Sequence, residues 1–342
     1  MRSRPGQTFE LAVGDGGKRL RAQLHPLRLP DGRRVDICVA TDESDDVSLS
    51  LAGGGYVIPA HYRLVEALAG SPGRGVDLGA HIGTFSLYAA SLGHAVVAVE
   101  ASERNVALLR ESAKANDFDR IDVVHAAVSG VRGYVEFTEM GPYGLVKPPL
   151  LDWPTVRVPA LTLDDLLEDL GWRDVDFVKM DVEGSEVSAL SGMRRLITET
   201  DVPLVFESNG HTLHLFDESP GRLLAALHEV GYRTWEIGDR HLIPVAPQDL
   251  QYQCVVDYLA LKRQPASIVG WSFGVPRSTD ANIEIAVAGL RDTNPNIRSY
   301  TARTLQQADS HLLADGRIQA QLRALGDDAE EFVRESVGWF FA

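Results

Sequence analysis

The chain has 342 residues, 44% hydrophobic and 24% charged, which is enough for one large domain plus a smaller one or for two modest domains. It carries 33 Lys and Arg against 48 Asp and Glu, and the net charge of −15 disfavours nucleic acid as a partner. The two cysteines, Cys38 and Cys254, are far apart and have no partners at metal-ligand spacing, so we expect reduced thiols and a cytoplasmic protein. No signal peptide and no bilayer-spanning stretch are predicted.

Residues 1–70 mix short apolar runs with glycine-rich turns. The acidic stretch 42–46 separates two segments that look like strands. We interpret this region as an N-terminal appendage that could form part of a lid.

Residues 71–263 show a regular alternation of apolar strands and amphipathic helices. The expected strands lie at 75–78, 95–99, 121–124, 134–137, 175–180 and 203–207, with a hairpin-like end through Trp235 and 252–261. The expected helices begin near Thr84, after the caps Ser102 and Thr162, and over 185–198 and 220–230. This order predicts a Rossmann-like α/β fold, a mostly parallel sheet with helices on both faces.

Residues 264–342 change in character. Two similar blocks, 290–298 and 325–334, each place Leu, then Asp, then an aliphatic residue and Arg that open a second helix. The pattern predicts a small helical region, either HEAT-like hairpins or an ordinary helical cap. Such helices could support packing, self-association or contact with a protein partner.

A glycine-bearing turn between the first strand and the first helix of this region is typical of a ligand site. In residues 76–84, Gly79 and Gly83 would let the backbone turn tightly and approach a ligand. A third glycine of the dinucleotide fingerprint is missing, and Asp77 suits a cationic or hydroxyl-rich ligand better than a pyrophosphate. Glu100 ends the next strand, where an acid can bind the ribose hydroxyls of an adenosine cofactor.

A second polar segment, 177–186, delivers Lys179, Asp181 and Glu183 to the carboxyl end of a strand. Glu207 ends the next strand, and His211 and His214 follow it. Because clustered acids repel one another, they need a cation, hydrogen bonds or water. Asp181, Glu183 and Glu207 could hold Mg²⁺, although we do not expect a metal requirement.

These motifs, in this order, resemble the FkbM family of methyltransferases. The shared pieces are 76–83, Glu100, 162–166, 179–186 and 205–207, within a region from about Pro72 to Ile237. The resemblance implies a class I enzyme that uses S-adenosylmethionine, with O-methylation of a hydroxyl on a small molecule, often in natural-product or sugar pathways. At His81 the family commonly has Asn, and residues 140–144 lack a clear Ser.

The resemblance also implies roles for individual residues. It assigns cofactor binding to Asp77, Gly79, His81, Gly83, Glu100 and Asp181. It makes Glu183, Asp181, Glu207 and His211 the candidate catalytic residues, one of them a general base. Tyr143, Trp153 and 147–149 fall where a loop could face the substrate.

Two other functions remain open from the residues. One is an NAD-dependent or nucleotide-sugar oxidoreductase on a similar fold, because Glu100 would serve NAD equally well. The other is a non-catalytic methyltransferase-like scaffold whose helical tail binds a partner.

Overall fold

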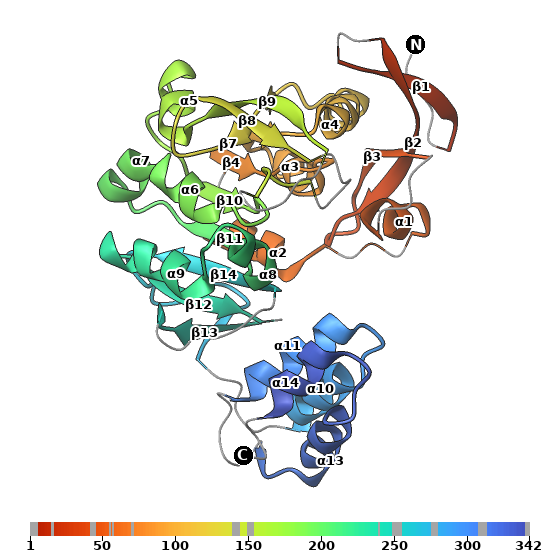
Figure 1. Cartoon of the computed structure of the whole chain (residues 1–342). Coiled ribbons are helices and arrows are strands. Elements are labelled where there is room, and N and C mark those ends of the chain that lie inside the picture. The colour runs from red at the N-terminus through yellow and green to blue at the C-terminus, as the bar shows by residue number, and fades with distance from the viewer. Residues whose placement is uncertain are drawn as a thin grey trace.

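The computed structural model describes residues 6–14, 17–41, 46–54, 56, 58–69, 72–138, 144–148, 154–238, 240–247, 255–274, 280–306 and 313–338 (Figure 1). Tyr143, Trp153, Pro149 and Cys254, which bear on the predictions above, lie outside these ranges. Within the described ranges, no helix is long and apolar enough to cross a bilayer.

A large sheet forms the centre of the fold, and nine of its strands are described. In spatial order they are β15 (Ser272–Phe273), β13 (His241–Val245), β12 (Arg233–Ile237), β14 (Val255–Leu261), β11 (Leu204–Asn209), β10 (Phe177–Met180), β4 (Arg74–Leu78), β5 (Ala95–Glu100) and β6 (Ile121–His125). From β6 through β5, β4 and β10 to β11 the strands are parallel, in the order 3-2-1-4-5 of the Rossmann fold. Strand β14 is inserted antiparallel between β11 and β12. The predicted Rossmann-like, mostly parallel sheet is confirmed.

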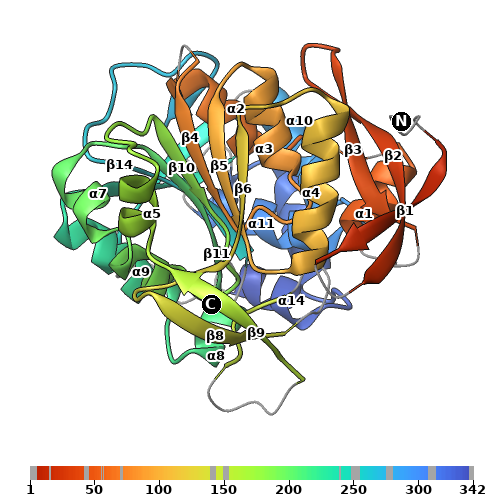
Figure 2. The ribbon, with the colours of Figure 1, turned by 90° about the horizontal axis from the view of Figure 1, so that it is seen from above.

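Helices cover both faces of this sheet (Figure 2). One face packs against α2 (Ala60–Ala69), α3 (Thr84–Ser91) and α4 (Glu103–Ala115). The other packs against α5 (Leu163–Asp169), α6 (Glu186–Ser191), α7 (Arg194–Glu199), α8 (Gly210–Leu215) and α9 (Pro220–Glu229). Side chains alternate between the two cores, so Val96 and Ala98 of β5 enter the first core and Val97 and Val99 the second. A sheet buried on both faces explains why these strands are continuously apolar.

In two segments of the large domain, tertiary contacts override or complete the local sequence pattern. The helix expected over 185–198 is divided into α6 and α7, and between them a Cβ on Gly192 would collide with the Ser129 carbonyl oxygen. The strand expected at 134–137 does form, as β8 (Gly133–Phe137). It belongs to a separate small sheet with β7 (Ala127–Val128) and β9 (Val156–Leu161).

The N-terminal region packs on the large domain. Strands β1 (Thr8–Val13), β2 (Lys18–Arg28) and β3 (Arg34–Ala40) form an antiparallel sheet. The residues after the acidic stretch were expected to be a strand, but they form helix α1 (Asp46–Ala52). A short apolar run does not by itself separate helix from strand. Ile37 and Cys38 share one core with Leu108 of α4, so the sheet extends that core.

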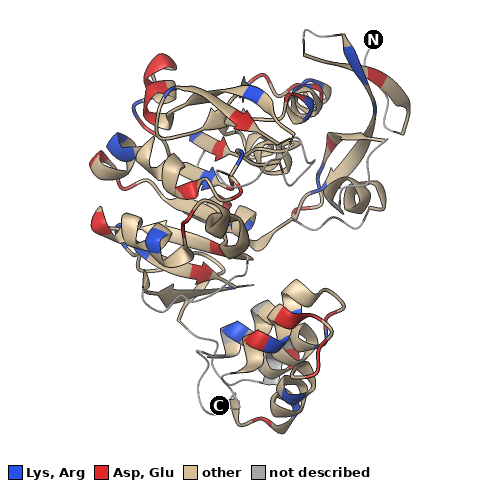
Figure 3. Cartoon of the chain, viewed as in Figure 1, with Lys and Arg blue, Asp and Glu red and all other residues tan. Residues whose placement is uncertain are grey.

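Residues beyond the sheet form helices α10 (Asp280–Leu290), α11 (Pro295–Gln306), α13 (Gly316–Leu325) and α14 (Glu331–Gly338), with a hydrophobic core of their own. In the first block, Arg298 donates to the carbonyl oxygens of Asp292 and Thr293. In the second, Arg334 donates to those of Asp328 and Ala329. The two blocks therefore share the same pair of side-chain-to-backbone hydrogen bonds. Acidic and basic residues intermingle on these helices, as elsewhere in the chain (Figure 3).

Candidate active site

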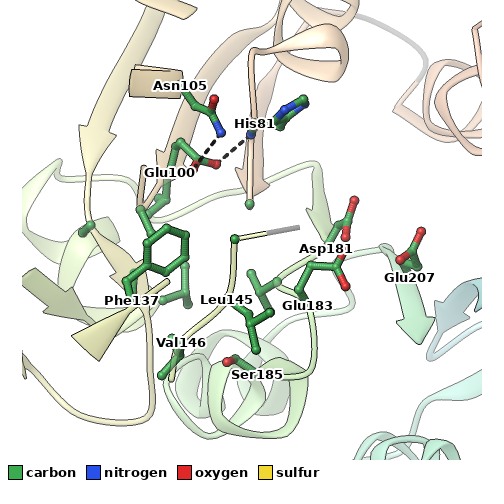
Figure 4. Close-up of a pocket in the computed structure, with 18 of the residues that line it drawn as sticks. His81, Glu100, Asn105, Phe137, Leu145, Val146, Asp181, Glu183, Ser185 and Glu207 are labelled. Carbon is green, nitrogen blue, oxygen red and sulfur yellow. Dashed lines mark hydrogen bonds between the residues drawn. The ribbon is translucent and has the colours of Figure 1, made fainter. Parts of the chain in front are cut away.

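A cavity of about 250 Å³ lies at the carboxyl ends of β4, β5, β10 and β11, where Rossmann-like sheets bind their ligands (Figure 4). One end is apolar and contains Glu100, and the other end is acidic. The lining residues are Val47, Gly79, His81, Val99, Glu100, Ala101, Asn105, Ala126, Ala127, Val128, Phe137, Gly144, Leu145, Val146, Asp181, Val182, Glu183, Ser185 and Glu207.

The glycine-bearing turn brings backbone to the cavity wall. Gly79 has φ 73°, and a Cβ there would collide with the Asp181 carbonyl oxygen, so only glycine fits. His81 also lies in the left-handed region, with φ 50°. Asn and His are both enriched there, which accounts for the departure from the family's usual Asn.

Glu100 is held by this turn and by the start of α4. Its carboxylate accepts the backbone N–H of His81 at 2.8 Å and that of Ser102 at 2.8 Å. Asn105 approaches the same carboxylate at 3.5 Å. Burial raises the pKa of Glu100, and the two backbone hydrogen bonds oppose that shift. The carboxylate is therefore fixed in one orientation at the cavity wall.

Asp77 lies beneath the cavity and does not line it. It is fully buried, accepts a hydrogen bond from the Ser86 hydroxyl at 2.6 Å, and pairs with the Lys179 amine at 3.4 Å. The Lys179 amine also donates to the Gly79 carbonyl oxygen at 3.0 Å and pairs with Asp181 at 3.3 Å. Burial alone would lower the pKa of Lys179, but Asp181 and Asp77 outweigh it and raise that pKa. Lys179 thus ties the glycine turn to the acidic end of the cavity.

The acidic end consists of Asp181, Glu183 and Glu207, whose carboxylate oxygens lie within 4.8 Å of one another. Burial, and next the charge of Asp181, raise the pKa of Glu183 to about 7, although Asn209 donates to it at 3.4 Å. Burial and the same neighbour raise the pKa of Glu207. Such a set could accept hydrogen bonds from substrate hydroxyls or hold a hard cation.

The structure brings together six of the predicted site residues and leaves three outside the cavity. Gly79, His81, Glu100, Asp181, Glu183 and Glu207 line it. Gly83, with φ 92°, packs against Leu109, while His211 is exposed on α8. Asp77 supports the wall from below.

Other lining residues were not predicted, because they come from segments distant in the sequence. Val47 reaches the cavity from α1, and Phe137 from β8 of the small sheet. Neither residue belongs to a polar motif. An apolar side chain in a strand or helix normally indicates a residue of the hydrophobic core, so the sequence offered no reason to place these two in a binding site. The motif at Glu100 could have pointed to Asn105, which lies one helical turn beyond the cap Ser102.

Comparison with known proteins identifies a family for part of the chain. Residues 77–234 match the family model of the methyltransferase FkbM domain. This part of the chain is an FkbM methyltransferase domain. The search of the curated proteins found no match.

Solved structures similar to the chain include methyltransferases. The chain is 23% identical to methyltransferase FkbM from Methylobacillus flagellatus, with a TM-score of 0.37 over 55% of this chain and 43% of that one. It is 13% identical to an S-adenosylmethionine-dependent methyltransferase from Agrobacterium tumefaciens, with a TM-score of 0.39 over 74% and 76%. For a TehB-like methyltransferase from Corynebacterium glutamicum the identity is 16% and the TM-score 0.37, over 63% and 94%. The matched region thus spans less than half of the Methylobacillus protein.

The FkbM domain contains most of the cavity but not all of its surroundings. Gly79, Glu100, Asp181, Glu183 and Glu207 lie inside the matched residues. Helix α1, helix α2 and strand β14 lie outside them, and α1 contributes Val47 to the cavity wall.

Proposed function

We propose that the chain transfers a methyl group from S-adenosylmethionine to a hydroxyl of a small molecule. The observation that carries this proposal is the cavity at the carboxyl ends of the parallel strands, most of which lies in the FkbM domain. It joins a buried strand-end carboxylate, Glu100, to a cluster of three carboxylates at the other end.

The cavity residues fit the cofactor's chemistry. Glu100 keeps lone pairs free to accept hydrogen bonds from the ribose hydroxyls, in the place where Rossmann-like folds use an acid for that purpose. Val99, Ala127, Phe137 and Leu145 provide apolar surface for an adenine ring. The bare backbone at Gly79 allows close approach of the rest of the molecule.

When bound, S-adenosylmethionine supplies a sulfonium methyl group that a substrate oxygen can attack in line. The protein's contribution is to align the two reactants and exclude water. Asp181, Glu183 and Glu207 would accept hydrogen bonds from the hydroxyls of the acceptor and orient them. Lys179 holds Asp181 and the Gly79 carbonyl in place.

We further propose a cytoplasmic enzyme whose acceptor is a natural product or a sugar. The mixed cavity, apolar at one end and rich in hydrogen-bond acceptors at the other, supports a hydroxylated small molecule. The net charge of −15 does not favour a nucleic acid.

The first test is calorimetry of the purified protein with S-adenosylhomocysteine and, separately, with NAD. We expect S-adenosylhomocysteine to bind and NAD not to bind. Glu100→Ala should weaken binding at least tenfold, while Glu168→Ala, which removes an exposed carboxylate on α5, should leave it unchanged. Binding of NAD alone would favour an oxidoreductase, and binding of neither would favour the scaffold.

The second test is transfer of tritium from methyl-labelled S-adenosylmethionine to a panel of sugars, phenols and aliphatic alcohols. We expect label in at least one hydroxylated acceptor. Label in an amine or thiol acceptor and in no hydroxylated one would overturn O-methylation while retaining methyl transfer.

A further inference from the structure

A histidine and a carboxylate from outside the matched family region meet beside the acidic end of the cavity. His61 lies at the start of α2, and Asp257 lies in β14. The His61 Nδ1 atom is 2.8 Å from an Asp257 carboxylate oxygen. The side chains are 13% and 34% exposed, so the pair is shielded without being sealed from solvent.

The sheet places this pair next to the proposed acceptor site. Asp257 is the direct neighbour of Glu207 across the β11–β14 ladder. A small cavity is lined by His61 and Asp257 together with Lys179, Asp181 and Glu207. Asp181 and Glu207 line the larger cavity as well, so the two cavities share a wall.

Because His61 Nδ1 makes the hydrogen bond to Asp257, the second ring nitrogen, Nε2, can act on the substrate. A carboxylate on Nδ1 favours the tautomer with hydrogen on Nδ1, which puts the basic lone pair on Nε2. Among the residues that the structure describes, no hydrogen bond to Nε2 is found. This is the carboxylate–histidine arrangement that hydrolytic enzymes use to orient a general base.

We propose that His61, oriented by Asp257, is the general base that accepts the proton of the substrate hydroxyl. This inference rests on the proposed methyl transfer. As the oxygen forms its bond to the methyl carbon, the carbon–sulfur bond breaks and its electron pair stays on sulfur. The hydroxyl proton moves to His61 Nε2, and the Asp257 carboxylate stabilises the resulting imidazolium.

The neighbouring carboxyls have other partners. Asp181 is paired with Lys179, and Asn209 donates to Glu183. We therefore assign them to orienting the acceptor and assign proton acceptance to the His61 imidazole.

The experiment compares wild type with His61→Gln and Asp257→Asn, using the best acceptor from the tritium screen. Gln can still hydrogen-bond Asp257, and His25→Gln on β2 serves as the matched control. We expect His61→Gln to lower kcat on the order of 10²- to 10⁴-fold, the usual contribution of a general base. The KM, the melting temperature and the affinity for S-adenosylhomocysteine should stay near their wild-type values.

The split between kcat and KM separates catalysis from structure, because a general base acts on the chemical step rather than on binding. The titratable groups that line the small cavity with His61 or contact its ring are Asp257, Glu207, Asp181, Lys179 and Tyr62. A His61→Gln variant that keeps the wild-type kcat would overturn the proposal.

A measurement without acceptor keeps this proposal distinct from the proposed function. Nitrogen-15 NMR of the histidine rings should show hydrogen on Nδ1 of His61 in wild type and a changed tautomer balance in Asp257→Asn. Hydrogen on Nε2 of His61 instead would overturn the proposal, even if methyl transfer is established. Failure to bind S-adenosylhomocysteine would instead count against the proposed function.

Discussion

Asp77 is fully buried, and its oxygens face Lys179 and Ser86 rather than the cavity. Removing one member of a buried ion pair leaves the other charge without compensation, at a cost of about 3–5 kcal/mol. We therefore expect Asp77→Ala to lower the free energy of unfolding by about that amount. Urea denaturation measures it, and Ser86→Ala should cost much less. An Asp77→Ala variant that is as stable as wild type but binds the cofactor more weakly would instead show that Asp77 contacts the cofactor directly.

Glu186, at the start of α6, is 1% exposed, and burial is the main cause that raises its pKa to about 8. The unfolded chain releases this proton near the ordinary pKa of about 4.3, whereas the folded chain holds it to about pH 8. The folded state thus binds more protons between these values, and stability falls as the pH rises through this window.

Glu186→Gln removes that titration and retains an oxygen to accept the Gly184 N–H. We expect the free energy of unfolding of the variant to rise relative to that of wild type between pH 5 and 8, by at most about 1.4 kcal/mol per pH unit. Urea unfolding at several pH values measures this difference. Parallel stability curves for the two proteins would contradict it.

The carboxylates of Asp181, Glu183 and Glu207 could hold a cation, but protons and Lys179 already relieve much of their repulsion. We expect methyl transfer and S-adenosylhomocysteine binding to be unchanged after dialysis against EDTA. Addition of Mg²⁺ to the dialysed protein should have no effect. Activity lost in EDTA and restored by Mg²⁺ would show that the three carboxylates need the metal.

Residues of the site were predictable where a polar side chain follows a buried strand, as Glu100, Asp181 and Glu207 do. A strand's carboxyl end is a position that the sequence pattern itself locates. His61 and Asp257 carry no such mark, because one begins a helix and the other lies in an antiparallel strand inserted later. Their meeting depends on the tertiary fold. Gly83 is the opposite case: the motif predicted a ligand-binding residue, but in the structure Gly83 packs against Leu109.

At the scale of elements, the parallel strands and their caps followed from local chemistry. Ser102 and Thr162 cap α4 and α5 by accepting backbone N–H groups, as their sequence context predicts. The small sheet of β7, β8 and β9 was not predictable, because its pairing joins segments roughly 20 to 30 residues apart. Alternating polarity in 133–137 indicated a strand but not its partner.

A partly buried ion pair joins the helical blocks. The Arg298 guanidinium makes two bonds to Asp328, at 2.8 and 2.9 Å, and the two side chains are 16% and 8% exposed. We expect Arg298→Ala to lower the free energy of unfolding of this region by about 2–4 kcal/mol, since a shielded bidentate pair and two carbonyl contacts are lost. Thermal unfolding followed by circular dichroism measures it.

Arg323→Ala, on the exposed side of α13, is the matched control and should change stability by less than about 0.5 kcal/mol. Equal effects of the two substitutions would mean that the Arg298–Asp328 pair does not join the blocks. Cofactor affinity should be the same in both variants, because the cavity is built from other elements.

At the scale of the whole molecule, the described residues form three hydrophobic cores, one on each face of the sheet and one among the C-terminal helices. The first two share the sheet and should unfold together. The third has its own set of buried residues, in helices that lie as a group apart from the sheet (Figure 1). An electrostatic link joins the two parts: burial raises the pKa of Glu236 on β12, and the charge of Arg303 on α11 opposes that shift. A link of this kind is a weak coupling between two cores.

We therefore expect residues 1–274, which retain β15, to fold and to bind S-adenosylhomocysteine within about threefold of the full chain's affinity. In the full chain, calorimetry should show two transitions. Ligand at 100 times its Kd should stabilise only the transition of the sheet-containing part, by about 2.7 kcal/mol. For a domain of this size that corresponds to a rise of roughly 5–10 °C in its melting temperature. One transition that moves as a whole, or an insoluble truncated chain, would show that the helices complete the catalytic fold through contacts such as that of Glu236 and Arg303.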